Sequence, residues 1–394
     1  MNVLMLTQVL PFPPDSGPKV KTFNMIKFLA QEHDLTLVSF VRGDQSGDVE
    51  QLRPYCKAIY TVPIRRTRLH DGLALVRSLV TGEPWTIVRD SRHEMHSQVA
   101  ELCRTGHFDI IHADQLNMAQ FAPANSGSRR VLDAHNALWL LYRRLAQTTR
   151  NPWIALFWQR EWRLLKRYEG GICQAFDAVL AVSDADRAAL QEASNGKGNL
   201  SVAPIAVDPE SILPVQRVAQ ADHILHIGTM FWPPNVDGVL WFLREVYPLV
   251  QAARPGVHFD IVGARPPKQV TETGRLLQGV TVAGYVKEPA DYLKNTGVMV
   301  VPLLSGGGMR VKILEALAEG LPVVTTAIGC EGIAVENGRH LLVADTAEEF
   351  ARATLRLLEN PALAETLARN GRELIERCYD FRTAYKPVEL VYKT

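Results

Sequence analysis

Short apolar runs alternate with helical patterns along almost the entire chain, and this alternation is the strongest constraint on its fold. The runs "NVLMLT", "LTLVSFV", "FDIIHAD", "RRVLDAH" and "AVLAVSD" in the first half are typical of strands. Between the first two lies "KVKTFNMIKFLAQEH", whose apolar residues recur at helical spacing. Strands that are apolar throughout belong to parallel sheets covered by helices on both faces. The first half therefore predicts a doubly wound α/β domain.

A proline-rich stretch, "PIAVDPESILPVQRVAQADH", then interrupts the pattern between Pro204 and His223 and is typical of a linker. The alternation restarts with the strand patterns "ILHIGT", "FDIVGA", "VTVAGYV", "GVMVVPLL" and "LPVVTTA", and with a helical pattern at "VDGVLWFLREVYPLVQAA". A chain of 394 residues suits two domains. We expect two Rossmann-like domains, residues 1–205 and 206–375, facing each other across a cleft.

Composition excludes several classes of protein. The 43 Lys and Arg residues balance 42 Asp and Glu residues, which gives no reason to expect a nucleic-acid partner. The five cysteines are scattered without a C-x-x-C pair and are typical of reduced thiols in the cytosol. No apolar run reaches the roughly 18 residues that span a bilayer, and the first residues lack a basic region typical of a signal peptide. We expect a soluble, cytoplasmic protein.

Three consecutive glycines stand within "LLSGGGMRVKILEALAEGLPVV", between a strand pattern and a helical pattern. They are Gly306, Gly307 and Gly308. The carboxyl end of a strand and the amino end of a helix together attract anions, and residues without Cβ allow close approach to the main chain. Arg310 and Lys312 follow at once and supply positive charge for a phosphate.

Glu315 lies one turn beyond Lys312 on the same predicted helix face, where its oxygens would accept the hydroxyl groups of a ribose. The segment thus suits a nucleoside diphosphate. It is neither a P-loop nor a G-x-G-x-x-G fingerprint. The alternative is a tight loop followed by a solvated face with a weak ion pair.

The segment "GGGMRVKILEALAEGLPVVTTAIGCEGI" resembles the donor site of glycosyltransferase family 4, a group of retaining enzymes with the GT-B fold. The resemblance covers nearly the whole chain. It includes "PFPPDSGPKVKTFNMIKFLA", "VLDAHN", "AVLAVSDADRAAL", "PIAVD" and "HIGTMFWPPNVDGVLWFLREVYPLV". The last of these resembles a bacterial polysaccharide subgroup.

The resemblance implies transfer of a sugar from a nucleotide diphosphate sugar to an acceptor, with retained anomeric configuration and without a metal or other cofactor. The acceptor would be a saccharide, a lipid-linked sugar or a small molecule, in cell-surface polysaccharide or glycolipid synthesis. Residues 376–394 would cross back to pack on the first domain. Two other functions stay open: a nucleotide-sugar epimerase on the same fold, and a non-catalytic nucleotide-sugar binding protein.

The resemblance also implies roles for individual residues. Arg310 and Lys312 would neutralise the leaving diphosphate, and Glu315 would hold the ribose. His135 would reach the sugar or the reacting centre. The remaining binding positions are Ser16 and Gly17 in a loop that closes on the phosphates or acceptor, and Tyr285 and Val286 beside the base.

Two departures from the family pattern bear on the site. Where the family usually has a first glutamate, this chain has Gly307, so the main-chain N–H groups of Gly307, Gly308 and Met309 would contact the donor sugar instead. The usual arginine and lysine after the first strand of the second domain are replaced by "GTMFWPPN". Arg310 and Lys312 are therefore expected to carry the phosphate charge alone.

No pair of carboxylates is placed to serve double displacement, so we expect same-face transfer stabilised electrostatically. His135 follows a predicted strand, which favours a functional role over a structural one. His112 and Asp114 are weaker candidates for cleft-lining groups, and Asp133 is expected to be buried. No His, Cys or carboxylate cluster has metal-ligand spacing along the chain.

Aromatic and basic residues are concentrated between Leu138 and Glu169, and Ile64–Val80 has a similar character. Such helices suit a peripheral position on an anionic membrane surface, here the inner face of the membrane. The alternative is that the tryptophans pack inside the protein and the cations are solvated.

Overall fold

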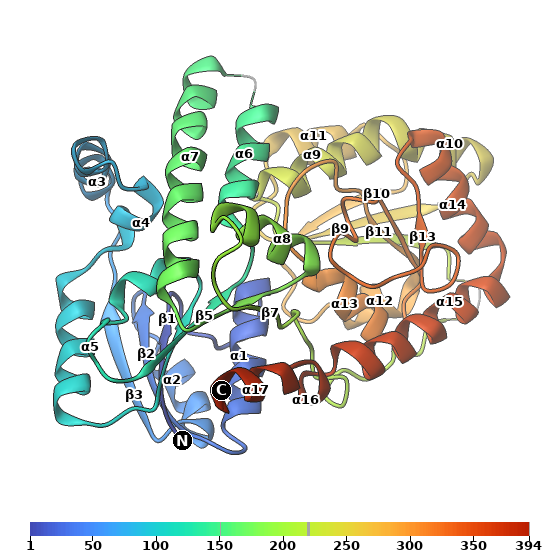
Figure 1. The fold of residues 1–394 in the computed structure, drawn as a ribbon. Coiled ribbons are helices and arrows are strands. Elements are labelled where there is room, and N and C mark those ends of the chain that lie inside the picture. The colour runs from blue at the N-terminus through green and yellow to red at the C-terminus, as the bar shows by residue number, and fades with distance from the viewer. Residues whose placement is uncertain (150, 219–220, 394) are drawn as a thin grey trace. The chain divides into compact units, whose positions relative to one another are not determined.

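The computed structural model describes residues 1–149, 151–218 and 221–393. The chain forms two compact units, one of Met1–Ala206 together with Phe381–Thr394 and the other of Val207–Asp380. Both are parallel α/β units, as the sequence predicts (Figure 1).

The first unit is built on a parallel sheet of seven strands in the order β3-β2-β1-β4-β5-β6-β7. The strands are β1 (Asn2–Thr7), β2 (Asp34–Val41), β3 (Ala58–Pro63), β4 (Ile110–Asp114), β5 (Arg129–Ala134), β6 (Ala178–Ala181) and β7 (Leu200–Val202). The five strands predicted in this half are all present. β3 and β7 were not predicted, because one is an edge strand with exposed side chains and the other has only three residues.

Helices cover both faces of this sheet. They are α1 (Gly17–Leu29), α2 (Ser46–Leu52), α3 (Arg68–Thr81), α4 (Trp85–Asp90), α5 (His93–Thr105), α6 (Leu138–Thr148), α7 (Pro152–Ala175) and α8 (Asp184–Ala193), with short 3-10 turns at Arg53–Tyr55 and Leu116–Phe121. Alternate residues of β1 pack into opposite cores, Leu4 and Leu6 on one face and Val3 and Met5 on the other. Burial on both faces explains why the strand reads as a continuous apolar run.

The end of the chain belongs to the first unit. Its helices are α16 (Phe381–Ala384) and α17 (Lys386–Lys393), and α16 packs against α1 (Figure 1). Phe381, Tyr385 and Tyr392 are buried in the same core as Val3 and Met5.

The second unit has a parallel sheet of six strands in the order β10-β9-β8-β11-β12-β13. The strands are β8 (His223–Ile227), β9 (His258–Val262), β10 (Val280–Gly284), β11 (Thr296–Val301), β12 (Val323–Thr325) and β13 (Leu342–Val343). The helices are α9 (Pro233–Trp241), α10 (Tyr247–Ala253), α11 (Lys268–Arg275), α12 (Ala290–Asn295), α13 (Val311–Ala318), α14 (Ala347–Glu359) and α15 (Pro361–Leu374).

The helix predicted over 236–253 begins earlier, at Pro233, and contains a π-helical segment at Phe242–Val246 between α9 and α10. Pro248 explains the irregularity, because it has no N–H group and its ring collides with a carbonyl one turn before it.

The proline-rich stretch forms no helix or strand over 204–218 and 221–222 apart from a single bridge between Val207 and Asp380. The boundary between the two units falls within it, at Ala206 and Val207. Residues 219 and 220 of this predicted linker lie outside the described residues.

Candidate active site

The glycine loop lies where the sequence places it, between the carboxyl end of β11 and the amino end of α13. Gly306 and Gly308 have φ values of 125° and 74°, a region that side chains with a Cβ rarely adopt. Gly306 is buried, whereas Gly307 and Gly308 are partly exposed, so the main chain of these two glycines is accessible to a ligand at a helix amino end. Met309, which follows the loop, is buried and anchors it to the core.

Arg310 folds back over the loop from the position just before α13. Its Nη1 donates a hydrogen bond to the Gly308 carbonyl at 2.8 Å and another to the Gly307 carbonyl. The guanidinium thus lies directly beside the three glycines. An anion on the loop would be within reach of the same group.

Lys312 lies on the first turn of α13 and contacts a different part of the unit. Its Nζ donates to Oδ1 of Asn235 at 3.0 Å, and Asn235 in turn donates to the Thr229 carbonyl at 2.9 Å. Gly228, just after β8, leaves room for the ammonium, because a Cβ there would collide with it. The stretch "GTMFWPPN", which stands where the family pattern has an arginine and a lysine, therefore supplies an amide that holds Lys312.

The electrostatics of this cluster favour a bound anion. Burial, and then the charge of Arg310, lower the pKa of Lys312 to about 7. Burial, and then the charge of Lys312, lower the pKa of the neighbouring His226 to about 3, so this imidazole is neutral. A negative ligand would favour the charged form of an ammonium that lies beside a guanidinium, and would therefore raise its lowered pKa.

Glu315 lies one turn along α13 from Lys312. Burial, and then the charge of Glu319, raise the pKa of Glu315 to about 7, while Lys312 opposes this rise. Within the described part of the chain its carboxyl group makes no hydrogen bond or ion pair. Its oxygens are therefore available to ligand hydroxyl groups.

Tyr285 and Val286 follow the carboxyl end of β10, at the same edge of the sheet as the glycine loop. Three strand spacings separate β10 from β11, which amounts to about 14 Å. Tyr285 is 74% exposed. These two residues do not adjoin the loop, and only a ligand extended along the strand ends would reach both.

His135 lies in the first unit, directly after β5. Its Nε2 is 2.9 Å from Oδ1 of Asp114, and its Nδ1 is buried without a hydrogen-bond partner. Thr22 donates to the Asp114 carboxylate at 3.0 Å. Burial would raise the pKa of Asp114, but the charge of His135 lowers it below its usual range, so the carboxylate is charged and fixes the imidazole.

Ser16 precedes α1 in the same unit, in extended backbone conformation, and its exposed side chain makes no capping hydrogen bond. Gly17 is the first residue of the helix. The hydroxyl and the first N–H groups of α1 are therefore open to solvent.

His112 has a structural role, contrary to the expectation that it lines a cleft. Its side chain is completely buried, and its Nδ1 is 2.7 Å from the hydroxyl group of Tyr392 in α17. Asp133 is buried as expected and forms an ion pair with Lys21, which is equally buried. Asp114 is fully buried and contacts His135.

The fold brings together one ligand atom each of Asp114, Asp133 and His135 within 4.8 Å, a grouping that linear spacing did not reveal. Such a group could hold a metal ion. Here the Lys21 ammonium already neutralises Asp133. Independence from metal stays a prediction.

Comparison with known proteins decides the family. The sequence profile described as "Glycosyltransferase Family 4" matches residues 17–211, and that described as "Glycosyl transferases group 1" matches residues 221–360. The chain belongs to glycosyltransferase family 4. A phosphatidyl-myo-inositol mannosyltransferase from Mycobacterium leprae is 25% identical to this glycosyltransferase over 314 residues, 76% of this chain and 77% of that protein.

Solved structures share the fold of this family 4 glycosyltransferase. A sucrose-phosphate synthase from Thermosynechococcus elongatus is 18% identical, with a TM-score of 0.73 over 100% of this chain and 98% of that one. The Anabaena protein HepE, solved in complex with UDP, is 14% identical, with a TM-score of 0.68 over 100% of both chains. The fold is GT-B.

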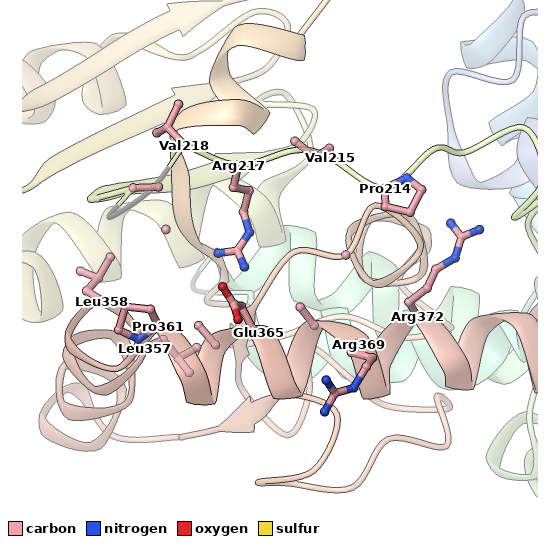
Figure 2. Close-up of a pocket in the computed structure, with 15 residues that line it drawn as sticks. Pro214, Val215, Arg217, Val218, Leu357, Leu358, Pro361, Glu365, Arg369 and Arg372 are labelled. Atoms are coloured by element: carbon pink, nitrogen blue, oxygen red, sulfur yellow. The ribbon is translucent and has the colours of Figure 1, made fainter.

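The second unit has a cavity that none of the predicted site residues line (Figure 2). It has a volume of about 590 Å³ and is lined by Gly297 and Gly320, near the amino ends of β11 and β12. Figure 2 shows Arg217 pointing toward Glu365 on α15. This is the edge of the sheet opposite the glycine loop, so the cavity is separate from the candidate active site.

The tryptophans of the aromatic, basic segment differ in burial. Trp139 is fully buried and packs on Trp162 with ring centroids 6.3 Å apart, which corresponds to the core alternative. Trp153, at the start of α7, is 79% exposed. Arg150 of this segment lies outside the described residues. Within the described ranges, no helix has the length and apolar character needed to cross a membrane.

Proposed function

We propose that this glycosyltransferase moves a sugar from a nucleoside diphosphate donor to an acceptor hydroxyl group, with retention of anomeric configuration. The observation that carries the proposal is that Arg310 lies beside the glycine loop and Lys312 lies on the first turn of the helix that follows it, with a Lys312 pKa of about 7 that an anion would raise. Two cations at a helix amino end suit a diphosphate. The activities named for the relatives suggest a polysaccharide or glycolipid product, and the HepE complex suggests UDP.

The proposed step is electrostatic. The bond between the anomeric carbon and the diphosphate oxygen breaks, and Arg310 and Lys312 stabilise the negative charge that develops on the leaving diphosphate. The acceptor oxygen bonds to the anomeric carbon on the same face. Its proton passes to the leaving phosphate, so no side-chain nucleophile is required.

Supporting roles follow from the geometry of each unit. Glu315 accepts hydrogen bonds from the ribose hydroxyl groups, and the N–H groups of the glycine loop contact the donor sugar. In the first unit, Asp114 accepts from Nε2 of His135, which leaves Nδ1 for a hydrogen bond with a substrate hydroxyl group. Ser16 and Gly17 offer a hydroxyl group and N–H groups to a phosphate or to the acceptor.

We also propose that the protein associates peripherally with an anionic membrane surface. One face of α3 exposes Leu69, Leu73, Val76, Leu79 and Val80. Arg68 and Arg77 are exposed on the same helix, and Arg160 of α7 bonds to Ser78 at 2.6 Å, which places the two helices side by side. Apolar residues flanked by cations fit an anionic lipid surface.

The donor assignment is tested by calorimetric titration of UDP, GDP, dTDP and ADP into the wild type and Arg310→Ala. The matched control is Arg339→Ala, which removes an exposed arginine of the same unit. We expect the wild type to bind one of the four nucleotides selectively. This binding should be lost in Arg310→Ala and kept in Arg339→Ala. If no nucleotide binds to the wild type, the loop is an architectural feature and the proposal fails.

A further inference from the structure

A second group of arginines lies in the first unit, around the cavity that His135 lines. The cavity has a volume of about 300 Å³, and Arg42, Arg66 and Arg89 all line it. Arg42 directly follows β2, and Arg66 follows β3. The cavity therefore lies at the carboxyl ends of the strands, the edge at which open α/β sheets bind ligands.

Among the residues that the structure describes, Asp90 supplies the one carboxylate paired with these cations. Its Oδ1 accepts from Arg66 Nη2 at 2.7 Å and lies 3.8 Å from Arg89 Nε. Its Oδ2 accepts from Gln8 at 2.6 Å and from Asn117 at 2.8 Å. Asp90 is fully buried and its oxygens are saturated, so it fixes the arrangement but balances only one of three positive charges.

The other two guanidinium groups retain unused donors. Within the described residues, the guanidinium of Arg42 forms no hydrogen bond or ion pair. Partial burial lowers its pKa, and the charge of Arg66 lowers it further. Nε of Arg89 is buried without a hydrogen bond, and its guanidinium stacks on the Trp85 ring at 4.4 Å from the centroid. Converging cations with unused donors call for an anion.

We propose that this cavity binds an anionic group, a phosphate or a carboxylate, carried by the acceptor. The assignment of the occupant as acceptor rests on the proposed function, whereas the anion site does not. A volume of about 300 Å³ is at the lower end for small-molecule sites, which suits a phosphate or an acidic sugar ring. Because His135 lines the same cavity, an anion held by the arginines would bring a neighbouring hydroxyl group of the acceptor close to this imidazole.

The test is calorimetric titration of inorganic pyrophosphate, at low ionic strength, into the full-length protein. The main variant is Arg42→Gln, since Arg42 has no ion pair whose loss would unfold the chain. Arg310→Ala removes the proposed donor clamp, and Arg104→Gln is a control that removes an exposed arginine of the first unit. We expect the wild type to bind at two sites. Arg42→Gln should weaken one of them about tenfold or more, Arg310→Ala should weaken the other, and Arg104→Gln should bind as the wild type does.

Each outcome decides between the two sites. Wild-type binding by Arg42→Gln, or no pyrophosphate binding by the wild type, overturns the cavity proposal whatever Arg310→Ala does. If Arg42→Gln loses a pyrophosphate site and Arg310→Ala does not, the result supports the cavity proposal and contradicts the donor-clamp role of Arg310. Inorganic phosphate and glucuronate are then titrated separately into Arg310→Ala. The one that binds more tightly identifies the anionic group, phosphate or carboxylate, that the cavity prefers.

Discussion

The Lys312 ammonium is held by the amide of Asn235 at 3.0 Å, across two helices that start at the same edge of the sheet. Because an amide is neutral, it orients the ammonium without cancelling its charge. The charge is left for a ligand. Asn235 is thus a positioning residue. Its replacement would change the orientation of the Lys312 ammonium without removing the charge of Lys312.

We expect Asn235→Ala to weaken nucleotide binding about tenfold, since a hydrogen bond to a charged group contributes about 1.5–3 kcal/mol. Asn235→Asp should weaken it further, because the new carboxylate would compete with the diphosphate for Lys312. Calorimetry with the nucleotide that the wild type selects is the measurement. Equal nucleotide affinity of Asn235→Asp and wild type would show that Asn235 and Lys312 do not belong to the donor site.

We predict that Gly228→Ala loses nucleotide binding, because the added Cβ collides with the Lys312 ammonium. The matched control is Gly72→Ala in α3, where a Cβ meets nothing within 4 Å. The control should keep wild-type affinity and gain slightly in stability, as alanine favours a helix by about 1 kcal/mol over glycine. Unchanged affinity in Gly228→Ala would show that the position of Lys312 is not critical.

The pKa of about 7 for Lys312 predicts a pH-dependent affinity for a nucleotide sugar. The ammonium is charged below this pKa, so affinity should fall as pH rises from 6 to 8, and binding should take up a proton. Lys312→Arg keeps its charge across this range and isolates the effect from Glu315, whose pKa is also about 7. If the wild type and Lys312→Arg have parallel pH profiles, Lys312 does not bind the diphosphate.

The glycine loop and its cations could be predicted from the sequence because they are contiguous and their chemistry is local. The contact between Lys312 and Asn235 could not, since it joins residues 77 positions apart that only the sheet brings together. The same holds for Lys21 with Asp133, and for the three arginines around Asp90. His112 illustrates the reverse case: its place near the carboxyl end of a strand resembles that of a site residue, but its burial depends on α17, from the far end of the chain.

We expect Asp114→Asn to lower kcat while leaving nucleotide affinity unchanged, because Asp114 fixes His135 in the first unit whereas the glycine loop belongs to the second. Thr22→Val, which removes a donor to Asp114, should have a smaller effect in the same direction. Separate measurements of turnover and of nucleotide binding distinguish this from general destabilisation. A loss of nucleotide affinity equal to the loss of kcat would indicate unfolding instead.

Leu73→Glu should reduce binding to vesicles containing anionic phosphatidylglycerol, because it places a carboxylate in the exposed apolar face of α3. Ala100→Glu is the control for charge, since it adds the same carboxylate at an exposed position of α5. Co-sedimentation with anionic and with neutral vesicles is the measurement. Equal sedimentation of Leu73→Glu and wild type would exclude this face from membrane contact.

The most direct test of the diphosphate clamp is the rate of sugar transfer by Arg310→Ala at saturating donor, with thermal unfolding as the control for the fold. We predict a loss of about 10²–10³-fold in kcat with an unchanged unfolding temperature, since removal of one charge-stabilising donor costs about that much. Near-normal turnover in a folded Arg310→Ala protein would contradict the account.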